Sequence, residues 1–294
     1  MTDTPRITQE MIELYDAYTH VTLDRRGLMG GLARLAGGTA AALAVLPLIE
    51  ASAAKAAIVA DDDARVVTET VEWPGAGGAL MRGYLVRPAG RPKRRAAVIV
   101  VHENRGLTPH IRDVARRAAL AGFTALAPDF LSSSGGTPAD EDAARTAIGK
   151  LDRPTAVANA VATVEFLRRH KLSSGKVGAV GFCWGGGMVN QLAVSAGKDL
   201  RAAVPFYGPV PEATDVPNIK AAVLAHFAGL DTRINAGVPA YETALKAAGT
   251  HYEIQMYEGV NHAFHNDGST ARYDKAAAEL AWGRTIAWFN TYLR

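Results

Sequence analysis

Residues 176–187, reading KVGAVGFCWGGG, constrain the fold of this chain more than any other stretch. An apolar run ends at Cys183, and glycines occupy the positions two residues before and after it, Gly181 and Gly185. This is the cysteine form of the G-x-S-x-G nucleophile elbow, where a strand turns so sharply into a helix that the flanking residues must be small. Residues 188–196 (MVNQLAVSA) are typical of the following helix. The pattern therefore predicts a nucleophilic cysteine at a strand-to-helix turn.

Apolar segments of strand length alternate with amphipathic segments along the chain. Strands are predicted at residues 96–102, 124–130, 201–207, 221–227 and 251–257, and helices at residues 109–121, 140–150, 154–170, 238–248 and 273–293. Residues 66–73 and 81–86 alternate apolar and polar side chains around a Pro/Gly-rich turn, which predicts an antiparallel hairpin at a sheet edge. The alternation predicts an α/β fold, a mostly parallel, doubly wound sheet flanked by helices, with ligands at the carboxyl ends of its strands.

Four side chains with catalytic chemistry follow predicted strands: Glu103, Cys183, Asp231 and His262. The order nucleophile, acid, histidine is that of the α/β-hydrolase triad. In such a triad His262 transfers protons, and Asp231 fixes its tautomer and stabilises the imidazolium. Cys183 would attack a carbonyl carbon as the thiolate, which a helix N-terminus favours. The elbow also predicts an oxyanion hole made by the backbone N–H of Trp184 and an N–H from the loop at Glu103.

Residues 1–60 differ in composition from residues 61–294, which we expect to form the α/β domain. The extension begins with a predicted amphipathic helix at residues 7–21. An arginine pair at 25–26 then precedes a small and apolar stretch that ends in Ala-Ser-Ala at 51–53. These are the parts of an export signal, and paired arginines favour the twin-arginine type, which carries folded proteins. The sequence thus predicts a periplasmic protein.

The alternative for the extension is a retained helical arm in a cytoplasmic protein, packed on the domain or on a second subunit of a homodimer. Asp24 stands where twin-arginine signals usually carry Ser or Thr, and Gly30 where Lys is common. The stretch from 28 to 49 is interrupted and rich in glycine, so we expect no stable membrane span.

Charge and motif content exclude several other classes of function. The net charge is +3, and the one dense basic run, at 91–95, has no interleaved aromatic residues, so we expect a solvated loop and no nucleic-acid partner. His262 and His265 form only an i, i+3 pair in a loop, which predicts no metal and no cofactor. The glycines at 185–187 lack the Lys-Ser/Thr of a phosphate-binding loop. One cysteine leaves the redox compartment open.

Several ordered motifs give the chain a family resemblance over residues 66–293. They are VHENRGL (101–107), APDF (127–130), VGFCWGG (180–186), FAGLD (227–231) and YEGVNHAFHN (257–266). The chain resembles the dienelactone hydrolases, or carboxymethylenebutenolidases, in particular their N-terminally extended bacterial members. The resemblance implies an α/β-hydrolase fold, a triad of Cys183, His262 and Asp231, and hydrolysis of lactones or activated esters through an acyl-enzyme.

The resemblance also implies roles for two residues after the strand at 96–102. Glu103 would contact the resting thiol and help to control its ionisation, and Asn104 would supply the second oxyanion N–H. The family's substrate-binding arginines are missing from the matching stretches LSSSGG (131–136) and AFHND (263–267). Dienelactone itself is therefore in doubt as the substrate, and we expect Arg105 or Arg233 to bind an anionic group unless both lie on the surface.

Each of the four site residues also has an ordinary alternative, namely a buried core cysteine, a loop-capping aspartate, a structural histidine and a solvated carboxylate. A competing function is a non-hydrolytic α/β protein that uses Cys183 as an oxidisable thiol or in binding. For a cysteine hydrolase we expect enol lactones or aryl esters as substrates, because a thiolate leaves a tetrahedral intermediate more easily than an alkoxide or an amine anion does.

Overall fold

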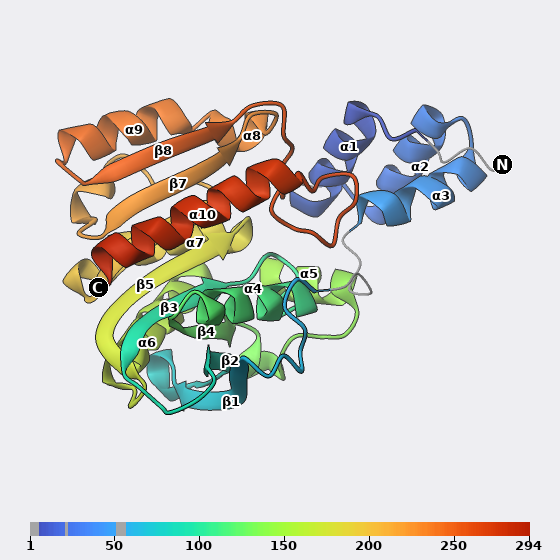
Figure 1. Cartoon of the computed structure of the whole chain (residues 1–294). Helices are drawn as coiled ribbons and strands as arrows, with labels where there is room; N and C mark the ends of the chain where they lie inside the picture. The colour runs from blue at the N-terminus through green and yellow to red at the C-terminus, as the bar shows by residue number, and fades with distance from the viewer. Residues whose placement is uncertain (1–5, 21–22, 51–56) are drawn as a thin grey trace.

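The computed structural model describes residues 6–20, 23–50 and 57–294, and their central element is one eight-stranded sheet (Figure 1). The strands are β1 (Val66–Pro74), β2 (Leu80–Pro88), β3 (Arg95–Val101), β4 (Thr124–Asp129), β5 (Ser173–Phe182), β6 (Leu200–Phe206), β7 (Ala222–Ala228) and β8 (Tyr252–Tyr257). Their order is β1-β2-β4-β3-β5-β6-β7-β8. The β1–β2 and β2–β4 pairs are antiparallel and the other pairs are parallel. The predicted mostly parallel sheet with an edge hairpin is confirmed.

Helices cover both faces of the sheet, as the continuous apolar strands require. They are α4 (Pro109–Leu120), α5 (Glu141–Gly149), α6 (Arg153–Arg169), α7 (Trp184–Ser195), α8 (Thr232–Asn235), α9 (Val238–Ala247) and α10 (Lys275–Tyr292). Val98 and Val100 of β3 belong to a core with α4 and α10, while Ala97 and Ile99 belong to a second core with α6 and α7. This alternation follows from the two-residue period of a strand.

The predicted elements differ from the observed ones mainly at their ends. Helix α7 begins at Trp184, directly after the turn, whereas its predicted part began at Met188. The helix start was predicted too late because residues 185–187 are all glycine, which is a poor helix former. The predicted loop at 131–138 contains a short 3-10 helix, Ser132–Ser134.

The N-terminal extension forms three helices: α1 (Gln9–His20), α2 (Arg25–Ala36) and α3 (Thr39–Ile49). They share a small core that includes Tyr15, Leu28 and Val45. The axes of α2 and α3 differ by 109° at the break, where Gly37 has φ +84°. The predicted single apolar stretch from 28 to 49 is therefore two helices. None of the described helices is by itself long and apolar enough to cross a membrane, although α2 and α3 together meet that test.

The three helices form an arm that packs on the α/β domain beside α5 and one end of α10 (Figure 1). Gln9 Nε2 donates to Asn261 Oδ1 at 2.7 Å, and the Ala271 N–H donates to the Leu48 carbonyl at 3.1 Å. The hydroxyl of Ser269 donates to the carbonyl of Ile49 at 2.7 Å. Val21 and the Ala-Ser-Ala sequence at 51–53 lie outside the described residues. Export through the twin-arginine route stays a prediction, as does a homodimer formed through the arm.

Candidate active site

The turn from β5 to α7 has the geometry that the G-x-C-x-G pattern predicts. Cys183 has φ +56° and ψ −114°, a conformation that side-chain-bearing residues rarely adopt. A Cβ atom at Gly181 would lie 2.2 Å from the carbonyl oxygen of Gly185, and one at Gly185 would lie 2.4 Å from the carbonyl oxygen of His102. Backbone surrounds both positions, so only glycine fits there.

Backbone strain in the described chain concentrates at this edge of the sheet. The non-glycine residues with positive φ are Cys183, Tyr207 and Ala263. Tyr207 directly follows β6, and its ring centroid lies 4.9 Å from that of His262. Ala263 directly follows His262 in the chain. Strained residues that gather around one point are typical of a functional site.

The structure brings the three residues of the predicted triad together. His262 Nδ1 lies 2.5 Å from Asp231 Oδ2, and both side chains are buried. Asp231 Oδ1 also accepts the backbone N–H of Ile234 at 3.2 Å, which fixes the carboxylate at the start of α8. His262 Nε2 is buried and has no hydrogen-bond partner among the described residues. The Cys183 sulfur lies on that side, within 4.8 Å of a ring nitrogen of His262.

The charges of Asp231 and His262 stabilise each other, which favours a carboxylate beside an imidazolium. Burial acts to raise the pKa of Asp231, but the hydrogen bond from His262 and its charge lower it below the ordinary value. Burial acts in the opposite direction on His262, but the neighbouring Cys183 and the Asp231 carboxylate raise the pKa of His262 to about 10. His262 therefore holds its proton when Cys183 and Asp231 both carry negative charge.

A second histidine, which the sequence did not point to, also contacts the thiol. His20, the last residue of α1, places Nε2 2.9 Å from Cys183 Sγ. Its ring packs edge-on against the ring of His262, with centroids 4.6 Å apart. No motif marks His20, because the contact joins positions 163 residues apart and depends on how the arm docks.

The donor atoms of His20, Cys183 and His262 all lie within 4.8 Å of one another. Thiolate and imidazole are ligand types that suit a soft divalent ion such as Zn²⁺. The sequence gave no reason to place His20 beside the other two, and the expectation of no metal stays a prediction. At 2.9 Å, His20 Nε2 and Cys183 Sγ lie closer together than two ligands of one tetrahedral zinc ion do, so these two atoms are hydrogen-bond partners and not ligands of one ion.

Glu103 lies near the site, where its partner is an asparagine. Glu103 Oε2 accepts from Asn266 Nδ2 at 2.6 Å, and Oε1 is buried without a hydrogen-bond partner among the described residues. Among the described residues, it is His20 that lies at hydrogen-bond distance from Cys183 Sγ. The thiol-modulating role of Glu103 stays a prediction. Asn266 was not singled out from the sequence, although it stands at the end of the motif YEGVNHAFHN.

The two predicted oxyanion donors border the same cavity as the thiol. Trp184 is the first residue of α7, so its backbone N–H has no acceptor within the helix. Asn104 follows β3, and its side-chain amide donates to the carbonyl of Thr19 in the arm at 3.0 Å. Cys183, Trp184 and Asn104 all line the cavity. Their use as an oxyanion hole stays a prediction.

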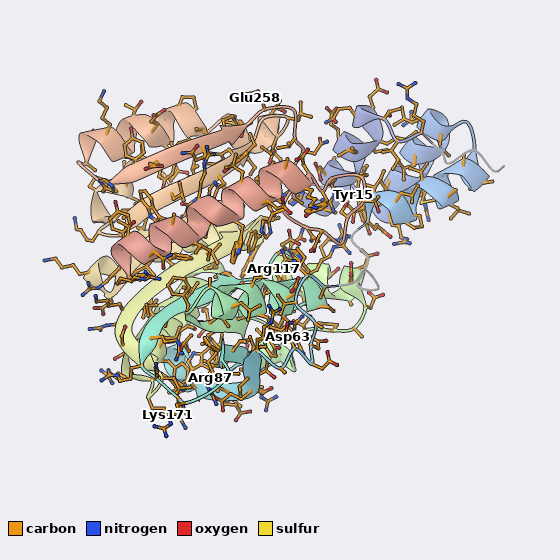
Figure 2. The ribbon with its side chains drawn as sticks, viewed as in Figure 1. Tyr15, Asp63, Arg87, Arg117, Lys171 and Glu258 are labelled. Carbon is orange, nitrogen blue, oxygen red and sulfur yellow. The ribbon has the colours of Figure 1, made fainter. Side chains whose placement is uncertain are left out.

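The cavity beside Cys183 has a volume of about 250 Å³. It is lined by Thr19, His20, Asn104, Arg145, Ile148, Gly149, Cys183, Trp184, Tyr207, Pro209, Arg233, Ile234 and His262. Of the two predicted anion-binding arginines, Arg233 borders this cavity. The guanidinium of Arg105 instead binds Glu141 and, at 2.6 Å, the hydroxyl of Tyr15, so it joins the arm to the domain. Figure 2 shows Tyr15 at this junction.

Comparison with known proteins identifies the family. Residues 81–293 match the Dienelactone hydrolase family. "Putative carboxymethylenebutenolidase" from Escherichia coli O157:H7 is 32% identical over 260 residues, which cover 82% of this chain and 93% of that protein. "Protein usf" from Aquifex pyrophilus is 34% identical over 228 residues, 74% of this chain and 95% of that protein.

Among solved structures, that of "Putative Dienelactone Hydrolase" from Klebsiella pneumoniae subsp. pneumoniae MGH 78578 superposes with a TM-score of 0.69 at 28% identity. The match covers 77% of this chain and 99% of that one. The fold, the nucleophile elbow and these matches all indicate the same family. The chain belongs to the dienelactone hydrolase family of carboxylic-ester hydrolases, within the α/β-hydrolase superfamily.

Proposed function

We propose that this protein hydrolyses lactones or activated esters through a Cys183–His262–Asp231 triad and an acyl-enzyme. The observation that carries the proposal is the buried Asp231–His262 pair, whose free Nε2 is on the side of the thiol at a strained elbow. This nitrogen has no other hydrogen-bond partner among the described residues and lies beside the one cysteine of the chain, the position a general base needs.

The proposed reaction begins when the Cys183 thiol gives its proton to His262 Nε2. The sulfur attacks the carbonyl carbon of the substrate. The resulting oxyanion accepts hydrogen bonds from the backbone N–H groups of Trp184 and Asn104. The tetrahedral intermediate collapses, the carbon–oxygen bond to the leaving group breaks, and His262 returns the proton to that oxygen. Water then attacks the thioester, with His262 as the base, and releases the acid and the thiol.

The substrate class follows from the leaving group and from the cavity. Thiolate is expelled more easily than an alkoxide, so acylation needs an enolate or phenolate leaving group. The volume of about 250 Å³ suits a small acyl group or a single lactone ring. Arg233 at its border supplies a positive charge for an anionic substituent. We expect an aryl ester to react at least tenfold faster than the matched anilide.

The test compares hydrolysis of an aryl ester and an enol lactone by the wild type, Cys183→Ser and His262→Ala. We expect both variants to lose at least about 100-fold in kcat, as expected for loss of a nucleophile or of a general base. His251→Ala is the matched control, because His251 is exposed and packs on Trp288, and it should keep full activity.

Activity that survives in both variants would overturn the triad. The competing role of Cys183 as an oxidisable thiol makes a different prediction, since reversible oxidation of the thiol by peroxide should then persist in His262→Ala while hydrolysis is absent from the wild type.

A further inference from the structure

The contact between His20 and Cys183 joins the N-terminal arm directly to the one thiol of the chain. Nε2 of His20 lies 2.9 Å from Sγ, a hydrogen-bond distance. His262 Nε2 has no hydrogen-bond partner among the described residues. The thiol therefore has a partner other than the triad histidine, and the direction of this hydrogen bond decides what the partner does.

The protonation of His20 follows from its other ring nitrogen. Nδ1 lies 3.0 Å from the backbone carbonyl oxygen of Asp16, which can only accept. Nδ1 also lies 2.7 Å from Thr19 Oγ1, whose own hydroxyl donates to the same carbonyl at 3.1 Å and is thus free to accept. The contact with the Asp16 carbonyl requires a proton on Nδ1, and the contact with Thr19 is compatible with it, so the assignment rests on the partners of this nitrogen. In the neutral imidazole the proton is then absent from Nε2, which presents a lone pair to the sulfur.

We propose that His20 is a residue of the active site: in the free enzyme it accepts the S–H proton of Cys183 and so holds the nucleophile in its neutral form. The description of Cys183 as a nucleophile rests on the proposed function, whereas the state of the thiol does not. A lone pair that faces the sulfur stabilises the thiol and repels the thiolate. His20 thus opposes the ionisation that His262 promotes from the other side.

The end of α1 favours the same state. His20 lies in the last described turn of this helix, at the end where the helix dipole places a partial negative charge. Two side chains of the domain hold these carbonyls in place: Arg145 Nη1 donates to the Tyr18 carbonyl at 2.5 Å, and Asn104 Nδ2 donates to the Thr19 carbonyl. The guanidinium of Arg145 offsets part of the negative end of α1, and the remainder acts on the sulfur against the positive end of α7.

The charge state of His20 agrees with this role. Burial and the neighbouring His262 hold the pKa of His20 well below its ordinary value, so the imidazole is neutral. A weak base of this kind accepts a hydrogen bond from the thiol without removing its proton. The proton then passes to His262, whose pKa rises as negative charge develops on the sulfur.

The experiment measures the thiol in His20→Phe and His20→Ala. Phe keeps a flat ring over the cavity and removes the acceptor, while Ala removes both. The ionisation of Cys183 is followed by thiolate absorbance near 240 nm against pH, with Cys183→Ser in the same background as the blank. Alkylation by iodoacetamide at neutral pH is followed in parallel, and His251→Phe is the matched control.

We expect both variants to ionise at lower pH and to be alkylated roughly 2- to 10-fold faster, the factor that one net hydrogen bond supports. Unchanged or weakened ionisation in both variants would overturn the proposal, because His20 would then be a spectator or a donor to the thiolate. Faster alkylation in His20→Ala alone, with unchanged absorbance, would also overturn it, because His20 would then only block access.

The tautomer gives a second readout that does not depend on a variant. In ¹⁵N-labelled wild type, the proton of the His20 ring should be on Nδ1, and a proton on Nε2 would contradict the assignment. Neither measurement needs turnover. If the thiol titrates as expected while esters and lactones are not hydrolysed, the proposed function fails and the role of His20 stands. If esters and lactones are hydrolysed but the thiol does not titrate as expected, the proposed function stands and the role of His20 fails.

Discussion

At the scale of single residues, the state of Cys183 depends on competing neighbours that the chain supplies from opposite ends. His262 comes from the loop after β8 and His20 from the end of α1. The sequence identifies the first of these, because the order of nucleophile, acid and histidine is visible in the chain. It cannot identify the second, because His20 has no spacing relation to the elbow.

The stability contribution of His262 should depend on pH. Its folded pKa of about 10 lies above the ordinary value of 6.5, so the contribution is fully present below pH 6.5 and is lost as pH rises through about 10. We expect the difference in unfolding free energy between wild type and His262→Gln to be a few kcal/mol near pH 6 and to shrink toward pH 10. Urea unfolding at several pH values measures it, and a constant difference would contradict the raised pKa.

At the scale of elements, the elbow is where local sequence most fully determines structure. The glycine spacing around Cys183 predicted both the turn and the crowding of Gly181 and Gly185 by backbone. The long central strands and amphipathic helices were also predictable, because their periods of 2 and 3.6 residues are visible in the chain. The break between α2 and α3 was not, because the apolar character continues across Gly37 and Gly38.

The crowding at the elbow gives a test with an internal control. Gly181→Ala would place its Cβ against the Gly185 carbonyl, so we expect a loss of roughly 1–3 kcal/mol or more in unfolding free energy. Gly283→Ala is the opposite case, since Gly283 lies in α10 with open space around its Cβ position, and it should gain about 0.5–1 kcal/mol. Thermal unfolding compares the two, and equal effects would argue against a strained turn.

At the scale of the whole molecule, the arm is the part for which sequence patterns leave two interpretations. The same residues satisfy the pattern of an export signal and pack as α1–α3 on the domain. Local pattern cannot choose between these, because docking depends on long-range contacts such as Arg105 with Tyr15. Export would decide whether the arm is still part of the mature enzyme. If the signal is removed after residue 53, the mature enzyme loses His20, and its thiol should then ionise at lower pH.

Intact-mass analysis of the periplasmic protein tests the prediction of export and cleavage. We expect a mature N-terminus just after the Ala-Ser-Ala sequence at 51–53. A periplasmic protein that still begins at Met1 or Thr2 would contradict cleavage, and the arm would then remain in the working enzyme.

The docking of the arm on the full-length chain should depend on Asp142. This carboxylate accepts a hydrogen bond from the Tyr18 hydroxyl at 2.8 Å and pairs with Arg25 at 2.7 Å. Burial raises its pKa, but the Tyr18 hydrogen bond and the nearby arginine charges lower the pKa below the ordinary value. Asp142→Ala removes both contacts, so we expect arm opening to become easier by about 1–2 kcal/mol. Hydrogen exchange of the α1 amides should then accelerate roughly 5- to 30-fold, while β3 and β5 stay protected.

The matched control is Asp199→Ala, which removes an exposed ion pair with Arg168 far from the arm and should leave α1 exchange unchanged. Because His20 is at the end of α1, opening of the arm should also free the thiol. Alkylation of Cys183 should therefore accelerate in Asp142→Ala and not in Asp199→Ala. If α1 exchange accelerates while alkylation does not, the arm moves without governing the thiol, and the link from the docking of the arm to the chemistry at Cys183 is broken.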